Sequence, residues 1–281
     1  KPQMPLSELD RASEMARDFD DDWLSSGFVK MFVDGVVDSR TAYMLNAYPG
    51  TMERAEPLFE LERFKDLCTE IDRRGLQIAV HSIGDAAVRQ TIDGYEAAQQ
   101  RNGKRDSRHR IEHIELIDRA DVPRLGALGI TASVQPPHPP GAMDFPMSSM
   151  ETVFHKARWR DAYLWKTLRD HGAPLAFASD WPVTDVSVMR GIQAAMTRKP
   201  YEGCGDERVS LMDTLYAYTA GGAWAGHLDG LTGRLTPGLA ADLVMIDGDI
   251  ETIPAEQIGQ TGIALTVSGG RITHQGQGFA G

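Results

Sequence analysis

The stretch LQIAVHS, residues 76–82, is followed almost directly by GDAAVRQTIDGYEAAQQ, residues 84–100, and these two segments decide the fold class. The first is a short apolar run that predicts a buried strand, and the second is typical of a helix. Asp85 stands near the start of the expected helix, where a carboxylate is expected to accept hydrogen bonds from unpaired backbone N–H groups. A strand that leads straight into a helix is the repeating unit of parallel sheets.

The same alternation continues on both sides of this pair. Further strands are expected at 27–35, 109–116, 130–135 and 174–179, and further helices at 56–75, 118–129, 160–172, 186–198 and 211–224, with a long loop at 143–150. Five strands with helical crossovers indicate an α/β protein, either a barrel or an open sheet. A closed (β/α)8 barrel needs eight strands, so three of them would have to precede residue 1.

The pattern changes after about residue 228. The segments GRLTPGLAADLVMIDGD, residues 233–249, and IALTVSGGRITHQG, residues 263–276, predict short strands joined by Gly and Pro turns, with no helix between them. We therefore expect two domains, residues 1–228 and residues 229–281.

Composition excludes several kinds of partner. The chain has 281 residues and a formal net charge of −11, which disfavours nucleic acid, because phosphate contacts need clustered Lys and Arg. No apolar run reaches the roughly 20 residues that span a bilayer. The two cysteines, Cys68 and Cys204, form neither a metal-type pair nor a disulfide framework. Cys68 lies on the apolar stripe of its helix, which indicates core packing. We expect no nucleic acid and no membrane partner, and a cytoplasmic location.

Polar side chains stand where each expected strand ends. They are Lys30 and Asp34, His81, His113, His138 and Asp180, in the order of the five strands. The carboxyl ends of parallel strands meet at one edge, where sites are built, and imidazoles with a carboxylate are ligands for a divalent metal such as zinc. Each residue alone also has a structural explanation: a strand-end histidine is often a satisfied hydrogen-bonding residue, and Asp180 could cap the next segment. The residues alone leave both interpretations open.

Six motifs occur in an order that resembles a known family. They are VKMFVDGVVDSRTA, AVHSIGDAAV, RIEHIEL, SVQPPH, FASDWPV and GRLTPGLAADLVMID. This order is similar to that of the amidohydrolase superfamily, and more narrowly of its amidohydrolase-3, YtcJ-like branch, which includes N-substituted formamide deformylases. The resemblance covers nearly the whole chain. It implies strands 4–8 of a partial (β/α)8 TIM barrel and part of a small β-sandwich built from both chain ends.

The resemblance also implies a set of metal ligands. Lys30 matches the fourth-strand lysine, which many members carbamylate, and His81 and His113 match the ligands of the fifth and sixth strands. Asp180 matches the eighth-strand aspartate, which would be both a ligand and the catalytic proton carrier. A salt bridge with Asp34 or Asp38 is the alternative role for Lys30. The first-strand His-x-His pair of the family is absent, so we expect the C-terminal part of a longer enzyme, inactive by itself.

The implied function is metal-dependent hydrolysis of an amide or related C–N bond by metal-activated water. The cofactor would be a divalent metal, zinc in preference, with one or two ions in the intact protein. His138, Trp181 and Arg40 would contact a small-molecule substrate, although a structural ion pair is an alternative for Arg40. An inactive fragment or binding module remains open, as does a mononuclear deaminase that uses His81, His113 and Asp180 without a carbamate. An incomplete barrel exposes sheet edges, so the missing N-terminal part and a second copy of the chain are expected partners.

Overall fold

The computed structural model of this chain describes residues 6–276, and its contacts divide them into two compact units. The first unit contains the residues up to Ser133 together with Ser148–Pro174. The second contains Val134–Met147 and the residues from Leu175 onward. The boundary passes through one strand, β4 (Thr131–Val134), whose last residue is counted with the second unit.

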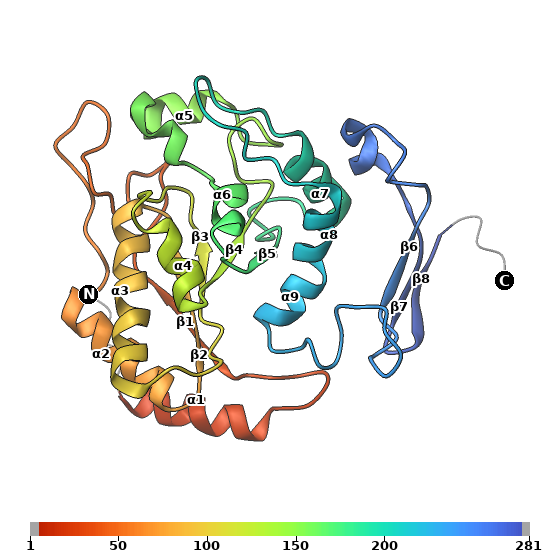
Figure 1. Ribbon diagram of the computed structural model, residues 1–281, viewed down its shortest axis with the longest axis horizontal. Helices are drawn as coiled ribbons and strands as arrows, with labels where there is room; N and C mark the ends of the chain where they lie inside the picture. The colour runs from red at the N-terminus through yellow and green to blue at the C-terminus, as the bar shows by residue number, and fades with distance from the viewer. Residues whose placement is uncertain (1–5, 277–281) are drawn as a thin grey trace. The chain divides into compact units, whose positions relative to one another are not determined.

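The first unit alternates strands with helices (Figure 1). Its elements are α1 (Leu6–Asp18), β1 (Phe28–Phe32), α2 (Leu61–Arg73), β2 (Gln77–Ser82), α3 (Asp85–Asn102), β3 (Arg110–His113), α4 (Val122–Leu128), β4, α5 (Ser148–Val153), the 3-10 helix η1 (Lys156–Asp161) and α6 (Trp165–Asp170). The expected strands and crossover helices are therefore confirmed, although α1 had no recognised signal. The helix expected over 160–172 is shorter and follows η1, and α5 begins inside the expected loop at 143–150.

The sheet runs in the order of the chain, β1-β2-β3-β4-β5, with β5 at Leu175–Phe177. Strands β1 to β4 pair in parallel, and the register places Phe32 opposite His81 and Ser82 opposite His113. Ala178 donates its N–H to the Val134 carbonyl at 3.1 Å, which extends the pairing beyond β5. This α/β sheet agrees with the predicted fold class, while closure into a barrel stays a prediction.

Strand β2 is buried at all six positions, so both of its faces are covered, and helices α2 and α3 pack against it. Helix α2 directs Phe64, Leu67, Cys68 and Ile71 into the core, as the spacing of its apolar residues predicts. It packs closely on α3 at Gly94, where a Cβ atom would lie 2.6 Å from the Phe64 ring. The buried Cys68 confirms the predicted packing role, and burial raises the pKa of its thiol.

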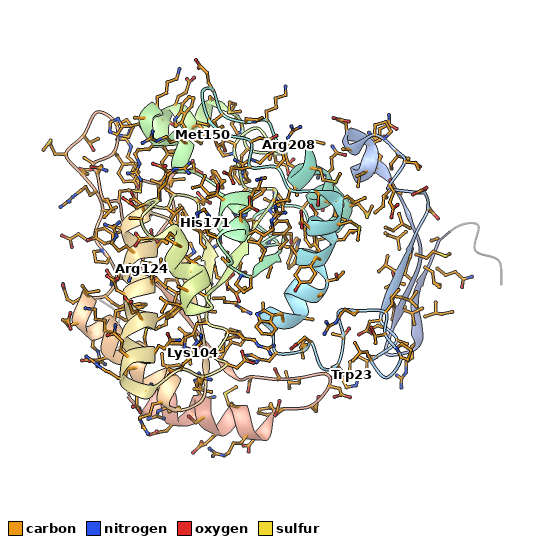
Figure 2. All side chains as sticks on the ribbon, in the orientation of Figure 1. Trp23, Lys104, Arg124, Met150, His171 and Arg208 are labelled. Atoms are coloured by element: carbon orange, nitrogen blue, oxygen red, sulfur yellow. The ribbon has the colours of Figure 1, made fainter. Side chains whose placement is uncertain are left out.

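Ion pairs tie the outer helices together. Arg124 of α4, labelled in Figure 2, pairs with Asp93 and Glu96 of α3, at 2.7 Å from each carboxylate. It also pairs with Asp121, immediately before α4, at 2.9 Å. Because four charged groups share one network, the contact holds α4 against α3 more firmly than an isolated surface pair would.

The predicted capping role of Asp85 is wrong. Gly84 occupies the N-cap of α3, and no side chain caps the helix there. Asp85 is the first helical residue, and its fully buried carboxylate accepts the Leu45 N–H at 2.8 Å and pairs with Arg158 at 2.8 Å. The carboxylate therefore fastens two neighbouring loops instead of the end of its own helix.

The second unit combines a helical layer with a small sheet. Its helices are α7 (Val188–Thr197), α8 (Leu211–Tyr218), α9 (Ala220–Ala225) and the 3-10 helix η2 (Ala255–Gln260), and its last strands are β6 (Leu243–Ile246), β7 (Ile263–Ser268) and β8 (Arg271–Gln275). The single helix expected over 211–224 is two helices, since Thr219 leaves helical geometry. Gly221 allows α9 to approach β5, because a Cβ atom there would lie 2.2 Å from the Leu175 carbonyl oxygen.

Strands β6, β7 and β8 form an antiparallel sheet in that order (Figure 1). The expectation of no helix between the last strands is wrong, because η2 lies between β6 and β7. Its Ile258 is fully buried with Met189 and Ile192 of α7, so burial of apolar surface explains this turn. Among residues 6–276 this region contains one sheet, and a sandwich stays a prediction.

The helices in the described part of the chain were compared with the length and hydrophobicity of a membrane span. None of the helices within residues 6–276 combines the length and hydrophobicity that a membrane span requires.

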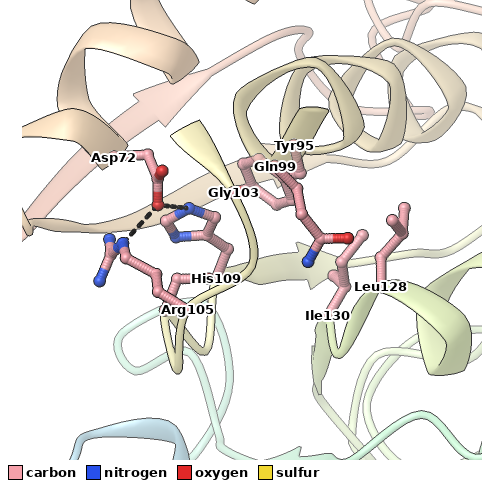
Figure 3. A pocket seen from close by; sticks show the side chains of 9 residues that line it. Asp72, Tyr95, Gln99, Gly103, Arg105, His109, Leu128 and Ile130 are labelled. Atoms are coloured by element: carbon pink, nitrogen blue, oxygen red, sulfur yellow. Dashed lines mark hydrogen bonds and ion pairs between the residues drawn. The ribbon is translucent and has the colours of Figure 1, made fainter. Parts of the chain in front are cut away.

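A buried polar cluster lies at the amino ends of β2 and β3 (Figure 3). Asp72 of α2 accepts hydrogen bonds from His109 Nε2 at 3.1 Å, Arg105 Nε at 2.6 Å and Asn102 Nδ2 at 2.8 Å. The Ile78 N–H donates to His109 Nδ1 at 3.1 Å. Burial pushes the pKa of Asp72 upward, but the donors His109 and Asn102 and the charge of Arg105 outweigh it and lower the pKa to about 2. The cluster joins α2, the loop after α3 and the first residues of both strands.

We predict that Asp72→Asn lowers the free energy of unfolding by about 1–3 kcal/mol at pH 7, because a buried charged acceptor is lost. A carboxylate whose pKa is lower in the folded state stabilises the fold above its unfolded pKa and loses that effect as pH falls through the folded pKa. The difference between variant and wild type should therefore shrink as pH falls from about 4 to 2. Urea unfolding at several pH values measures it. Asp66→Asn on the same helix, where an exposed carboxylate pairs with Arg101, is the control and should change little.

Candidate active site

The predicted site residues fall into two groups, one in each compact unit. Lys30, Arg40, His81 and His113 belong to the first unit, and His138, Asp180 and Trp181 belong to the second. Lys30 lies on β1, while His81 and His113 lie at or near the carboxyl ends of β2 and β3. Asp180 follows β5 by three residues.

The imidazole of His81 is held in one orientation. Its Nε2 atom lies 3.0 Å from the Gly35 carbonyl oxygen, in the loop that follows β1. A carbonyl oxygen only accepts, so Nε2 carries a proton, and in the neutral form of the ring the lone pair is then on Nδ1. A metal-binding histidine usually donates its other ring N–H to such an acceptor. The geometry therefore assigns Nδ1 as the nitrogen of His81 with which a metal would bind.

Asp34 lies directly behind this contact and is fully buried. Its carboxylate accepts the backbone N–H groups of Tyr43 at 2.9 Å, Ile83 at 3.1 Å and Gly84 at 2.9 Å. Burial raises the pKa of Asp34 to about 7, against the opposing effect of these three donors. The side chain thus connects the end of β1 to the loop that follows His81.

His113 has a strained backbone. Its φ is 82°, and the next residue, Ile114, has a φ of 48°. Such values are uncommon outside glycine and cost of order 1–3 kcal/mol each, and a β-branched residue there is a true outlier. Ser82 is the register partner of His113, and its hydroxyl contacts Thr91 of helix α3, so its side chain lies on the helix-covered face of the sheet. If side chains alternated strictly along β3, His113 would lie on that same face. The left-handed turn instead brings the ring of His113 beside His81.

The two imidazoles form a pair. Their ring centroids lie 4.5 Å apart at an angle of 67°, and Phe32 of β1 lies 5.0 Å from His81 on the other side. Both histidines are buried, with exposed fractions of 7% and 8%. Two buried nitrogen ligands side by side, one with a fixed tautomer, are the donor chemistry that zinc prefers. The residues of the first unit therefore supply two donors of the kind that a zinc ion takes.

Lys30 has different surroundings from those that carbamylation favours. Its side chain is exposed, and its Nζ lies 5.1 Å above the Phe32 ring. Carbon dioxide reacts with the neutral amine, which burial would favour. Lys30 instead lies on the exposed face of β1. The face of β1 that carries Lys30 also exposes Phe28 and Phe32. The carbamate remains a prediction that depends on further chain covering this face.

Asp180 of the second unit also has a strained backbone, with a φ of 58°. Its carboxylate lies 3.7 Å from His138 Nε2, and His138 itself is buried beside Phe145. The turn is fixed by its neighbours, since the Ser179 hydroxyl accepts the Trp181 N–H and the Asp180 carbonyl accepts the Val183 N–H. Strained residues held by such turns cluster at functional sites, which supports a functional role for Asp180.

The remaining predicted substrate contacts are exposed. Trp181 has an exposed fraction of 68%, and Arg40 is exposed with a φ of 55°. An exposed aromatic ring next to Asp180 suits contact with a small molecule better than core packing. Both roles stay predictions.

Sequence reasoning missed the residues that hold the ligands in place. No side-chain motif could show the Gly35 carbonyl. Asp34 was predicted as a strand-end carboxylate and as an alternative partner of Lys30, not as an acceptor of backbone N–H groups. Glu115 and Tyr163 were missed entirely: the Tyr163 hydroxyl donates to Glu115 at 3.1 Å, and the Tyr163 N–H donates to the Glu115 carbonyl at 2.8 Å. This clasp joins the segment after His113 to the loop before α6. A buried Glu two residues after a candidate ligand was the available signal.

The fold and these strand-end residues define a class of protein. The model of the amidohydrolase family matches residues 4–274, and the chain belongs to that family. A relative from Arabidopsis thaliana, Protein LONG AFTER FAR-RED 3, is 35% identical over 230 residues, which cover 80% of this chain and 39% of that protein. The protein YtcJ of Bacillus subtilis (strain 168) is 29% identical over 262 residues, covering 90% of this chain and 48% of YtcJ.

A solved structure shows the same fold. An uncharacterized metal-dependent hydrolase from Pyrococcus furiosus superposes with a TM-score of 0.71 and 28% identity, over 84% of this chain and 47% of that one. The chain therefore spans less than half the length of these relatives.

Proposed function

We propose that the intact protein hydrolyses an amide or related C–N bond, other than a peptide bond, at a divalent metal. The observation that carries this proposal is the His81–His113 pair, buried at the carboxyl ends of parallel strands in a member of the amidohydrolase family. By the resemblance to the YtcJ-like branch, the ligand set is Lys30, His81, His113 and Asp180. Zinc is the proposed metal because the ligands are imidazoles and a carboxylate.

The chemistry follows from what each group supplies. A bound zinc ion would polarise the substrate carbonyl and lower the pKa of water to about 7. His81 binds through Nδ1, because Gly35 fixes its proton on Nε2. Asp180 takes a proton from the attacking water and delivers it to the leaving amine. His138 places its imidazole beside this group, with Nε2 3.7 Å from the Asp180 carboxylate.

An inactive chain is the second candidate, and the exposure of Lys30 favours it for these 281 residues alone. The lysine lacks the cover that would keep its amine neutral, and the chain spans less than half the length of its relatives. We propose that residues 1–228 complete a barrel, and residues 229–281 a sandwich, only with a further N-terminal part. A mononuclear deaminase that uses His81, His113 and Asp180 would instead need no carbamate.

Metal binding and hydrolysis test the proposal together. The protein extended to the length of its relatives should hold one or two equivalents of zinc and release amine from N-substituted formamides or simple amides. His81→Asn and His113→Asn should each lower zinc affinity at least about 10-fold, because an imidazole ligand is lost. His155→Asn, an exposed imidazole that contacts the Ala47 carbonyl, is the matched control and should leave zinc affinity unchanged. Zinc below about 0.1 equivalent in the extended protein would contradict the proposal.

We further propose that β1 is the strand on which the N-terminal part, or a second copy, docks. It stands at one end of the strand order, and it exposes Phe28 and Phe32, with exposed fractions of 44% and 48%. Unpaired edges and exposed aromatic rings favour association.

Sedimentation velocity tests this docking strand. The 281-residue chain should form dimers or larger species at about 10 μM, because burial of the two rings removes apolar surface from water. Phe28→Ser combined with Phe32→Ser should shift the chain toward monomer. The double variant Met52→Ser and Leu235→Ser, which changes apolar residues exposed elsewhere, should not. A wild-type chain that remains a monodisperse monomer at this concentration would overturn docking of a second copy on β1.

A further inference from the structure

Two short motifs at the ends of β1 and β2 interlock. The first is Asp34-Gly35, after β1, and the second is Gly84-Asp85, at the start of α3. The Asp34 carboxylate accepts the N–H groups of Gly84 and Ile83, at 2.9 Å and 3.1 Å. In the reverse direction, the Asp85 carboxylate accepts the N–H of Leu45, in the loop that follows Gly35, at 2.8 Å. Asp34 thus holds the backbone at the second motif, and Asp85 holds the loop that follows the first.

The contact between the motifs is too close for other residues. A Cβ atom on Gly84 would lie 2.1 Å from the carbonyl oxygen of Tyr43, and that same oxygen accepts the Ala87 N–H at 3.2 Å. A Cβ atom on Gly35 would lie 2.1 Å from the Thr41 hydroxyl oxygen. Gly84 therefore lets the two loops approach, while Gly35 lets its own loop fold tightly against Thr41. The two aspartates fasten the loops together.

His81 lies inside this arrangement. Its carbonyl accepts the Val33 N–H at 3.1 Å, and its Nε2 atom reaches the Gly35 carbonyl at 3.0 Å. Both contacts involve neighbours of Asp34 in the chain. The Asp34 carboxylate is 3.7 Å from His81 Nε2, too far for a hydrogen bond, so its influence on the ring is the electrostatic attraction of a proton on Nε2 and the placement of the Gly35 peptide.

We propose that Asp34 is a positioning residue that selects the tautomer of His81. By fixing the loop after β1 on the loop after β2, it holds the Gly35 carbonyl where only an Nε2–H ring fits. Nδ1 is then presented as the ligand nitrogen before any metal arrives. Without the Asp34 carboxylate, the Gly35 peptide turns away and the ring exchanges between tautomers. This inference rests on the proposed function for its purpose, but its geometry does not involve a metal.

The test compares Asp34→Asn with Asp38→Asn in the metal-free chain. Asparagine keeps the size of Asp34 but turns one acceptor oxygen into a donor that faces backbone N–H groups. Nitrogen-15 NMR of the histidine rings reports the tautomer, with His81→Asn identifying the His81 signals. We expect the Nε2–H pattern in the wild type and in Asp38→Asn, and a mixture in Asp34→Asn. Zinc affinity should fall about 10-fold in Asp34→Asn, with an unchanged circular dichroism spectrum.

The outcomes separate this inference from the proposed function. An Nε2–H tautomer that becomes mixed in Asp34→Asn supports the positioning role even if the chain binds no zinc. A folded Asp34→Asn with the wild-type tautomer overturns it. If Asp34→Asn does not fold, hydrogen exchange of the wild type decides. Slow exchange of the Tyr43, Ile83 and Gly84 amides as one group supports the role, and fast exchange of Tyr43 and Gly84 overturns it.

Discussion

The parallel alignment of the strands is the constraint on which the candidate site depends. Because β1, β2 and β3 point the same way, their carboxyl ends share one edge, and residues almost fifty positions apart in the chain meet there. The Gly35 carbonyl reaches His81 only because Phe32 and His81 are in register. The amino ends of the same strands carry the Asp72 cluster, which holds helices and strands together. Ligand chemistry and stabilisation thus occupy opposite ends of the sheet, as is usual for parallel α/β folds.

Backbone strain occurs at the carboxyl end of β3, as it does at several other turns of the chain. His113, Ile114 and Tyr163 all have positive φ values within the first unit, and Asp180 has one in the second. In the first unit, the Glu115–Tyr163 clasp and the Asp34 contacts supply hydrogen bonds that keep the strained segments in place. Strain of this kind persists only where the surroundings over-determine it, which suits a site whose ligands must be fixed before they bind.

The elements that follow from the spacing of apolar residues could be predicted from the sequence. The features that depend on backbone geometry and backbone hydrogen bonds could not. The five strands and the crossover helices followed from apolar runs and their spacing, and so did the burial of Cys68. The sequence could not show that Gly84, not Asp85, is the N-cap of α3, because both residue types are accepted at helix starts. It could not show the break at Thr219, where the backbone leaves helical geometry although the residues on both sides are helical. The acceptor of His81 is a carbonyl group, which every residue has, so no side-chain pattern could identify it.

The central claim is that His81 and His113 jointly bind the metal of an amidohydrolase. Zinc X-ray absorption of the metal-loaded chain tests it most directly, because it reports the atoms that bind the ion. The account predicts at least two imidazole nitrogens at about 2.0–2.1 Å, with one imidazole lost in each of His81→Asn and His113→Asn. A sulfur neighbour at about 2.3 Å, or a spectrum that neither substitution changes, would place the metal elsewhere and contradict the account.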